Sequence, residues 1–385
     1  MSDDESGGQR GRAPRDFAGS GVFGPLWRER RRSRRSLVVA GLASALLLAA
    51  VIPSPYTIER PGPVVNTLGE VQIEGETQPV ISLPGTETYP TTGELNLLTV
   101  SLVGSPEHPV SWLSLVPAVI DPTQRIQPRS MFFPEGSTLE DREAQGTVQM
   151  QSSQAQAAAA AFRELGHEVP VELTVAAVSE GGPAEGVLRD GDVLTAIGGT
   201  PITDFAGLRA AIVAAGADSE LALAIERDGD AREVTLTPQI PEGGGDPLIG
   251  AVIATSFELP MEVDISLAEI GGPSAGMIFA LAIIDQLTPG AMLGDLTVSG
   301  TGTVTDAGVV GPIGGLEQKL WAAARADSDV FLMPVANCGD LPKRQPSGIE
   351  VVPVETLDEA LAAIEAAAAG TPVQGIERCE VGPAQ

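Results

Sequence analysis

The chain has 385 residues, of which 23 are basic and 51 are acidic, giving a formal net charge of −28. This acidic balance argues against nucleic-acid binding, because phosphates are bound by surfaces rich in lysine and arginine. Only two lysines, two histidines and two cysteines are present, and they fit neither a P-loop, a zincin motif nor a cysteine-cluster metal site. We therefore expect no cofactor and no resident metal ion.

Charge is distributed unevenly around an apolar run near the N-terminus. Residues 1–35 carry nine arginines against five acids, whereas the remaining 350 residues carry 14 basic and 46 acidic side chains. Residues 36–52 read SLVVAGLASALLLAAVI and are followed by Pro53. A spanning helix needs about 17–25 residues, so this run is at the short end. The positive-inside rule then predicts a cytoplasmic basic tail at 1–35, a single span at 36–53 and an extracytoplasmic body in the cell membrane. A cleaved signal peptide is the alternative.

Residues 54–160 are expected to form the first part of that body. Glycine and proline break residues 54–135 into short β-rich stretches, for example GELNLLTVSLV at 93–103. A polar, alanine-rich run over residues 142–165 predicts a helix that ends at Gly166.

Residues 161–240 change character. A β-branched run predicts a strand over 171–178, an Ala/Leu-rich run predicts a helix over 205–215, and Asp228-Gly229 indicates a hairpin. Between them lie GGPAEGVLRDGDVL and then GGTPI, which together resemble a PDZ domain of the bacterial type. The resemblance implies a groove in which a peptide adds as a strand, with a carboxylate-binding loop near residues 166–171. A spacer that binds nothing is the alternative.

Residues 241–370 alternate between strand and helix patterns and predict an α/β body, followed by a C-terminal tail at 371–385. The expected strands are 249–254, 263–267, 295–298 and 330–334, and the expected helices are 274–287, 316–326 and 357–369. In an oxidising compartment Cys338 and Cys379 could close the tail onto the body by a disulfide, and two unrelated thiols are the alternative.

A first candidate site is GGPSAG at residues 271–276, directly before an apolar helix. Ser274 would lie at the helix start, where unpaired backbone N–H groups stabilise negative charge. A simple N-cap serine in a Gly-Pro turn is the alternative. Residues 181–184 read GGPA, the same frame without the hydroxyl, so the frame alone is not diagnostic.

A second candidate is Lys319, within GPIGGLEQKL. It lies on or beside the buried stripe that Leu316, Leu320 and Ala323 form along a helix. A lysine in apolar surroundings loses its charge and can accept a proton from a serine hydroxyl. A lysine whose ammonium reaches solvent is the alternative, and Lys343 fits that description.

Together the two sites resemble the proteolytic domain of the Lon family, through GPSAG before an apolar helix and GPIGGLEQKLWAAARA before a strand ending in FLMP. The resemblance implies a catalytic dyad of Ser274 and Lys319. With the span and the PDZ segment, the chain resembles membrane-anchored, ATP-independent, PDZ-containing Lon-like serine endopeptidases. This implies an α+β and α/β Lon-type body interrupted by an inserted PDZ domain. It also implies recruitment of unfolded or exposed peptide segments, and a homo-oligomer, commonly a hexamer.

Two positions depart from the Lon pattern. Gly271 stands where Lon motifs often have aspartate, and residues 292–295 read MLGD where many have MTGE. Thr301, Thr303 or Asp295 could instead orient Lys319, and the sequence does not choose among them.

The two histidines, His108 and His167, lie in no catalytic motif and are set aside as triad members. The two departures motivate one alternative function, a non-catalytic PDZ scaffold or binding protein on a degenerate Lon-type fold.

Overall fold

The computed structural model describes residues 34–73, 75–241, 243–267, 270–372 and 379. The chain divides into one unit that ends at Val51 and a second that begins at Ile52. The described part of the first unit is a single helix, α1 (Arg34–Val51). The basic tail predicted for residues 1–35, except its last two residues, lies outside the described residues, as does most of the tail predicted for 371–385.

Most of the span predicted for residues 36–53 lies in helix α1. Across the residues that the structure describes, none of the helices is both long enough and apolar enough to cross a bilayer.

The second unit contains a six-stranded mixed sheet with the order β18-β17-β14-β5-β1-β6. Strands β5, β14, β17 and β18 run parallel to one another, and β1 runs antiparallel to both β5 and β6. The β-rich stretch after residue 54 and the α/β stretch at the C-terminal end therefore build one sheet. Its strands are β1 (Tyr56–Asn66), β5 (Glu94–Val103), β6 (Arg125–Pro128), β14 (Thr297–Gly300), β17 (Val330–Pro334) and β18 (Glu350–Val354).

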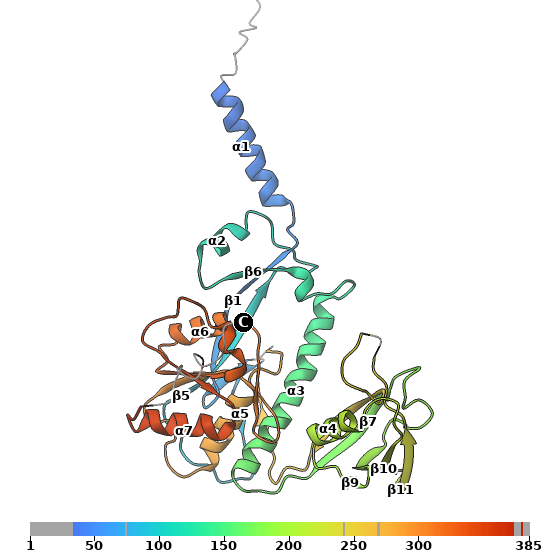
Figure 1. Cartoon of the computed structure of the whole chain (residues 1–385). Coiled ribbons are helices and arrows are strands. Elements are labelled where there is room, and N and C mark those ends of the chain that lie inside the picture. Colours follow the sequence, from blue (N-terminus) through green and yellow to red (C-terminus); the bar gives the residue numbers. More distant parts are fainter. Residues whose placement is uncertain (1–33, 74, 242, 268–269, 373–378, 380–385) are drawn as a thin grey trace, which may run out of the picture. The chain divides into compact units, whose positions relative to one another are not determined.

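The two faces of this sheet bury different helices. Side chains alternate along a strand, so Val330 and Leu332 of β17 belong to the main core, whereas Phe331 and Met333 belong to a second core with α6. Figure 1 shows α6 on one side of the sheet and α5 and α7 on the other. The helices are α3 (Leu139–Glu164), α5 (Gly276–Leu287), α6 (Leu316–Arg325) and α7 (Leu357–Ala368).

Helix α3 begins at a capping box, in which the Thr138 hydroxyl accepts from the Asp141 N–H and the Asp141 carboxylate accepts from the Thr138 N–H. The helix predicted over residues 142–165 is confirmed and begins three residues earlier. In its second half, five consecutive alanines are buried in the main core. Small side chains allow α3 to approach α5 closely.

The remaining small elements connect these layers. They are β2 (Glu70–Ile73), β3 (Glu76–Pro79), β4 (Ile81–Ser82), α2 (Leu115–Ile120), η1 (Arg129–Met131), β13 (Asp264–Ile265), β15 (Thr303–Val304), β16 (Val310–Gly311) and η2 (Val335–Asp340).

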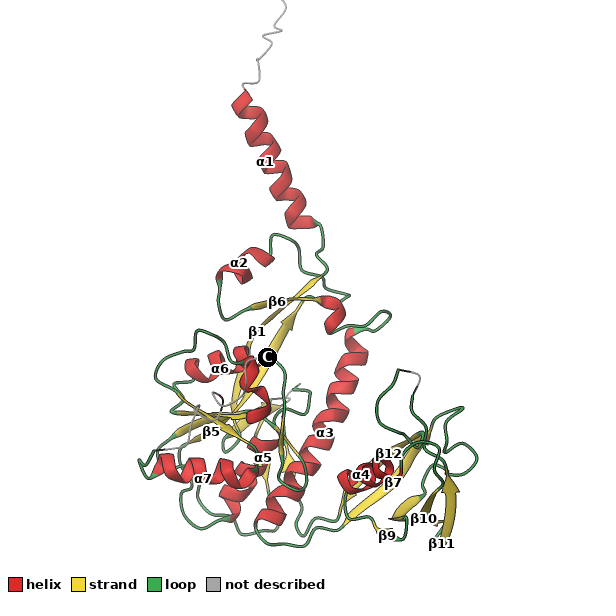
Figure 2. Cartoon of the chain, viewed as in Figure 1, coloured by secondary structure: helices red, strands yellow, loops and turns green. Residues whose placement is uncertain are grey.

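A second sheet has the order β11-β10-β8-β7-β12, with β9 paired to β8. Its own core includes Leu208 and Ile212 of α4. Figure 2 shows α4 beside β7 of this sheet. The strand, helix and hairpin predicted for 171–178, 205–215 and 227–230 are confirmed. The elements are β7 (Val171–Val178), β8 (Val193–Ile197), β9 (Thr200–Pro201), α4 (Phe205–Ala215), β10 (Leu221–Arg227), β11 (Asp230–Leu236) and β12 (Ala251–Phe257).

One strand lies in a different sheet from the one predicted. Residues 249–254 are predicted to belong to the α/β body, but β12 pairs antiparallel with β7 along its whole length. The Gly- and Pro-rich segment before β12 resembles an interdomain junction, but the chain returns after it to the same sheet. Because β7 and β12 lie far apart in the sequence, no local pattern indicates that they pair.

The Gly-Asp step of the PDZ-like motif has a structural explanation. Asp192, which is 1% exposed, accepts from Nε and Nη2 of Arg227 at 2.6 Å each. The Arg227 guanidinium also donates to the carbonyl of Val187 at 2.8 Å. Hydrogen bonding from Arg227 is the main cause that lowers the pKa of Asp192 below its usual value. The motif therefore places a paired, charged carboxylate inside this domain.

Near the C-terminus, Cys338 in η2 and Cys379 are joined by a disulfide, with their Cα atoms 5.1 Å apart. Of the two alternatives that the sequence left open, the structure has the disulfide.

Candidate active site

Ser274 lies in the turn immediately before α5. The first helical residue is Gly276 and the N-cap is Ala275, so Ser274 precedes the helix instead of beginning it as predicted. Its carbonyl accepts from the Gly302 N–H at 2.9 Å, and its side chain remains partly exposed. The turn is thus held through its backbone while the hydroxyl stays accessible.

Helix α3 supports this turn from the other side. The Gly272 N–H donates to the carbonyl of Gly146 at 2.9 Å, and the Ser153 hydroxyl donates to the carbonyl of Pro273 at 2.9 Å. A Cβ atom on Gly276 would lie 2.9 Å from the Ser153 hydroxyl oxygen, so only glycine fits there. Ser153 is buried, and sequence reasoning missed it because it lies in a polar run without a recognisable motif.

The glycine pair before α6 has a comparable steric reason. Gly315, the N-cap residue, adopts φ +69°, which is left-handed. A Cβ atom there would lie 2.6 Å from a methyl group of Val100 on β5. Glycine therefore allows α6 to begin close against the sheet, and this places Lys319 one turn further along.

Lys319 is buried in this position, with 3% of its surface exposed. Burial lowers the pKa of Lys319 to about 7, because the surroundings disfavour the charged ammonium. Among the described residues no carboxylate lies within ion-pair distance of its Nζ atom. A substantial neutral fraction of this lysine is therefore present at neutral pH.

Three side chains meet where α5, α6 and β14 converge. Lys319 Nζ lies 2.8 Å from Ser274 Oγ and 2.9 Å from Thr301 Oγ1, and Thr301 directly follows β14. The Thr301 hydroxyl donates to the Ser274 carbonyl at 3.1 Å. Because the threonine proton is used there, Thr301 accepts a hydrogen bond from Lys319, and the lone pair of a neutral Lys319 can then face Ser274.

The structure thus brings Ser274 and Lys319 together and selects Thr301 from the three polar candidates. Thr303 lies in β15, and Asp295 precedes β14. The departure at Gly271 also has a steric basis, since a Cβ atom there would lie 3.1 Å from the backbone of Gly146.

The MLGD segment at residues 292–295 has a structural role away from the three side chains. Leu293 is fully buried in the main core, and the Met292 N–H donates to the carboxylate of Asp285 at 3.3 Å.

The two histidines make other contacts. The His108 N–H donates to the Ser105 hydroxyl, and the His167 ring packs edge-on against Phe162 with ring centroids 5.9 Å apart. In the described part of the chain, no group of three or more His, Cys, Asp or Glu side chains could hold a metal ion.

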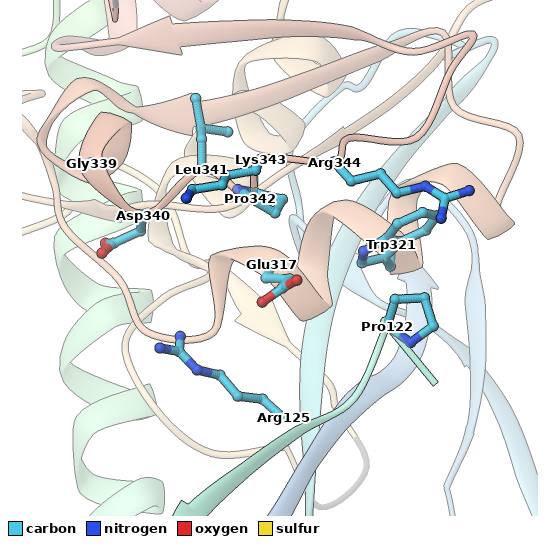
Figure 3. Close-up of a pocket in the computed structure, with 10 residues that line it drawn as sticks. All are labelled: Pro122, Arg125, Glu317, Trp321, Gly339, Asp340, Leu341, Pro342, Lys343 and Arg344. Atoms are coloured by element: carbon cyan, nitrogen blue, oxygen red, sulfur yellow. The ribbon is translucent and has the colours of Figure 1, made fainter. Parts of the chain in front are cut away.

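A hollow of about 490 Å³ lies beside α6 but is separate from these three side chains (Figure 3). Glu317 and Trp321 line it, each two residues from Lys319 and therefore on the opposite face of the helix. Its lining residues are Pro122, Arg125, Glu317, Trp321, Gly339, Asp340, Leu341, Pro342, Lys343 and Arg344.

Comparison with known families gives two matches. Residues 268–366 match the Lon protease (S16) C-terminal proteolytic domain, and residues 143–237 match the PDZ domain. The first range contains Ser274, Thr301 and Lys319.

Curated relatives are similar over the same region. The chain is 36% identical over 107 residues to the Lon protease of Trichlorobacter lovleyi, covering 27% of this chain and 13% of that protein. It is 40% identical over 94 residues to Lon protease 1 of Sorangium cellulosum, covering 24% of this chain and 11% of that protein. The chain therefore matches only a small part of the length of these relatives.

Among solved structures, the PDZ domain of the SdrC-like protein of Listeria monocytogenes is 20% identical with a TM-score of 0.20, covering 21% of this chain and 85% of that one. The corresponding PDZ domain from Listeria innocua is 23% identical with a TM-score of 0.20, covering 21% of this chain and 92% of that one. The chain therefore contains a region that matches the proteolytic domain of Lon proteases and a separate region that matches the PDZ domain.

Proposed function

We propose that the protein is a serine endopeptidase with Ser274 as nucleophile and Lys319 as general base. The observation that carries the proposal is the 2.8 Å separation of Lys319 Nζ from Ser274 Oγ. Burial also lowers the pKa of this lysine to about 7. A serine hydroxyl is a weak nucleophile until a neighbouring base accepts its proton. A neutral lysine fills this role without a histidine.

In the proposed reaction, Ser274 Oγ attacks the scissile carbonyl carbon while Lys319 Nζ takes the hydroxyl proton. Lys319 then gives that proton to the leaving amine as the C–N bond breaks, and an acyl-enzyme remains on Ser274. A water molecule, deprotonated by Lys319, hydrolyses this ester and regenerates the hydroxyl. We assign stabilisation of the oxyanion to the backbone N–H groups of Ser274 and Ala275, which precede α5.

Thr301 acts in this scheme as a positioning residue. Its hydroxyl connects the Lys319 amine to the Ser274 carbonyl, so it aligns the base with the residue that carries the nucleophile. It fixes the direction of the Lys319 lone pair without taking part in bond formation.

Substrates of this site would be unfolded or exposed peptide segments. The chain contains no P-loop sequence, so we propose cleavage that is independent of ATP. The PDZ domain would recruit such segments by strand addition. We assign the strand-addition edge to β12, the last strand in the sheet order. The carboxylate-binding loop near residues 166–171 stays a prediction.

We further propose that residues 36–53 anchor a homo-oligomeric body to the outer face of the cell membrane. This part rests on the sequence, since an uncharged run follows six arginines between Trp27 and Ser36. The disulfide between Cys338 and Cys379 agrees with an oxidising compartment. Carbonate extraction and protease protection of intact cells would test the anchor, and a soluble, N-terminally shortened product would contradict it.

Activity-based labelling tests the dyad directly. A fluorophosphonate should attach to Ser274 of the native protein, and Ser274→Ala should remove both the label and cleavage of an unfolded protein substrate. The chain offers a matched control for the base, because Lys319→Met should be inactive while Lys343→Met keeps native activity. Absence of labelling from pH 6 to 10 on folded native protein would instead favour the PDZ scaffold.

A further inference from the structure

An apolar patch lies on the surface outside the candidate active site. It consists of Trp112, Leu113, Val116, Val119 and Ile120, which are 45%, 39%, 50%, 75% and 76% exposed. These residues form α2 and the turn before it. No charged residue occurs between positions 109 and 120, in a body that carries a large excess of acidic side chains.

The inner side of α2 is already packed. Leu115 and Ala118 are buried in a small core with Ile58 and Val110. The apolar patch is therefore an additional face that folding of the chain leaves exposed. Soluble monomeric proteins rarely leave such contiguous apolar surface exposed, and it commonly marks a binding surface for protein or lipid.

The patch is joined by hydrogen bonds to the start of the second unit. The Trp112 N–H donates to the Ile52 carbonyl at 3.4 Å, and the Ser54 N–H donates to the Val110 carbonyl at 2.8 Å. Pro53 and Ser111 form an isolated β-bridge between these segments. Since Ile52 is the last residue of the uncharged run over 36–52, the apolar patch lies directly beside the residues that leave this run.

Aromatic and basic side chains cluster at the same place. The rings of Tyr56 and Trp112 pack edge-on with centroids 5.8 Å apart, and the chain has only two tyrosines and three tryptophans. Arg129 donates from its backbone N–H to the Pro55 carbonyl at 2.9 Å, and from its side chain to Ser54 at 3.4 Å. Met131, two residues further, is 64% exposed.

The nearest acid in sequence, Asp121, lies at the end of α2. Its carboxylate accepts hydrogen bonds from Thr123 and from the Gln124 side chain, and these bonds keep the pKa of Asp121 below its usual value. Asp121 therefore stays charged at the rim of the apolar patch, where it would face water and the headgroups.

We infer that the apolar patch is a membrane-contact surface that inserts into the interfacial layer of a phospholipid bilayer. Tryptophan and tyrosine favour this layer because it is apolar on one side and polar on the other, and arginine binds the lipid phosphates there. The inference rests on the proposed membrane location of the protein, but not on the Ser274–Lys319 dyad. It adds a second point of membrane contact beside residue 52.

Depth-dependent fluorescence quenching tests this surface in the full chain. The protein, with Trp27→Phe, is reconstituted into vesicles of phosphatidylcholine and phosphatidylglycerol that carry doxyl-labelled phosphatidylcholine. Trp112 should be quenched several-fold more strongly than Trp321, which belongs to α6 and has a buried Nε1 atom. Adding Trp112→Phe should remove the quenched component and leave the Trp321 signal.

Polar substitution provides the second measurement. Val119→Asn with Ile120→Asn should reduce the quenching of Trp112, whereas Val148→Asn, at a 65% exposed valine on α3, should not. Fluorophosphonate labelling of Ser274 in detergent should be unchanged in all variants, which shows that they are folded.

Equal quenching of Trp112 and Trp321 in vesicle-bound protein would overturn the inference. So would loss of self-association in detergent on Val119→Asn with Ile120→Asn, with no change in quenching, because the occupant would then be a second copy of the chain. Failure of the protein to float with vesicles would refute the anchor, and failure to label would refute the dyad. These failures are therefore distinguishable.

Discussion

Two buried charge-bearing sites in this chain are built in opposite ways. In the PDZ domain, Asp192 is paired with Arg227 by two hydrogen bonds of 2.6 Å, and burial is compensated by the opposite charge. In the proteolytic domain, Lys319 is buried to a similar degree, and its closest polar partners are the hydroxyls of Ser274 and Thr301.

The pKa directions follow from this difference. Hydrogen bonding from Arg227 lowers the pKa of Asp192, so that carboxylate stays charged at neutral pH. Burial alone lowers the pKa of Lys319 to about 7, so the amine is partly neutral. Burial with a counter-ion therefore yields a fixed structural charge, whereas burial with hydroxyl partners yields a base that can exchange its proton.

Lys319→Met is expected to have the largest effect and to act in opposite directions on activity and stability. Cleavage should fall by about a thousandfold or more, because the nucleophile loses its base. The free energy of unfolding should rise by up to about 4 kcal/mol at pH 7, since the native state no longer holds a lysine whose pKa lies below its unfolded value. Denaturant unfolding measures the second effect.

The gain in stability has a defined pH dependence. The unfolded chain binds the Lys319 proton more tightly than the native protein, so native stability rises with pH between about 7 and the unfolded value near 10.5. The difference between Lys319→Met and native protein should therefore shrink over this interval. A gain that does not change with pH would contradict a buried titrating lysine.

Asp192→Asn should have the opposite effect on stability. The substitution leaves Arg227 charged and largely buried, which should destabilise the PDZ domain by about 3 kcal/mol. Asp190→Asn, at an exposed aspartate two residues away, is the control and should change little. Hydrogen exchange of residues in the second sheet measures the effect, and equal protection in both variants would show that the pair is not stabilising.

Thr301→Val should weaken the base without removing it. Loss of the hydroxyl breaks the connection between Lys319 and the Ser274 carbonyl, and we expect kcat to fall by about tenfold to a hundredfold. Thr301→Ser should restore most of it, because the hydroxyl returns. A structural role in packing alone predicts instead that valine, which has the same shape, is as active as threonine.

The pH profile of native labelling should rise with the neutral fraction of Lys319. With a pKa of about 7, the rate of fluorophosphonate attachment should increase by about tenfold between pH 6 and pH 8 and then level off. A rate that keeps rising to pH 10 would mean that Lys319 retains the pKa of an exposed lysine.

The smallest effect is expected for Ser153→Ala. Its hydroxyl holds the carbonyl of Pro273, one residue before the nucleophile, so kcat should fall by about threefold to tenfold while KM is nearly unchanged. Ser152→Ala, at an exposed neighbour on α3, is the control. A change in KM with constant kcat would place Ser153 in substrate binding instead.

Sequence reasoning succeeded where the signal is local. The helix over residues 205–215 has the predicted bounds, and α7 begins after Thr356, whose hydroxyl accepts from the Glu359 N–H as an N-cap should. Periodicity and capping operate within a few residues, so they can be read directly from the chain. Ser274 and Lys319 stood out because each lies in a compact motif.

The rest of the site depends on contacts between distant segments. Thr301 could not be separated from Thr303 and Asp295, because the choice is made by the register of β14 against β5 and β17. Ser153 is 120 residues from the carbonyl that it supports. Likewise, β12 belongs to the second sheet because it pairs with β7, which lies more than 70 residues earlier in the sequence.

The contact of α3 with the turn before Ser274 also bears on the synthesis of the protein. Gly146 and Ser153 are made well before Ser274, and Lys319 is made after it, so the three segments of this arrangement enter the fold at different times. A nascent chain that has not yet reached residue 319 contains Ser274 without the proposed base. Hydrolytic capacity would thus appear only once the tertiary structure is complete, which protects the chain from cutting itself while it is being made.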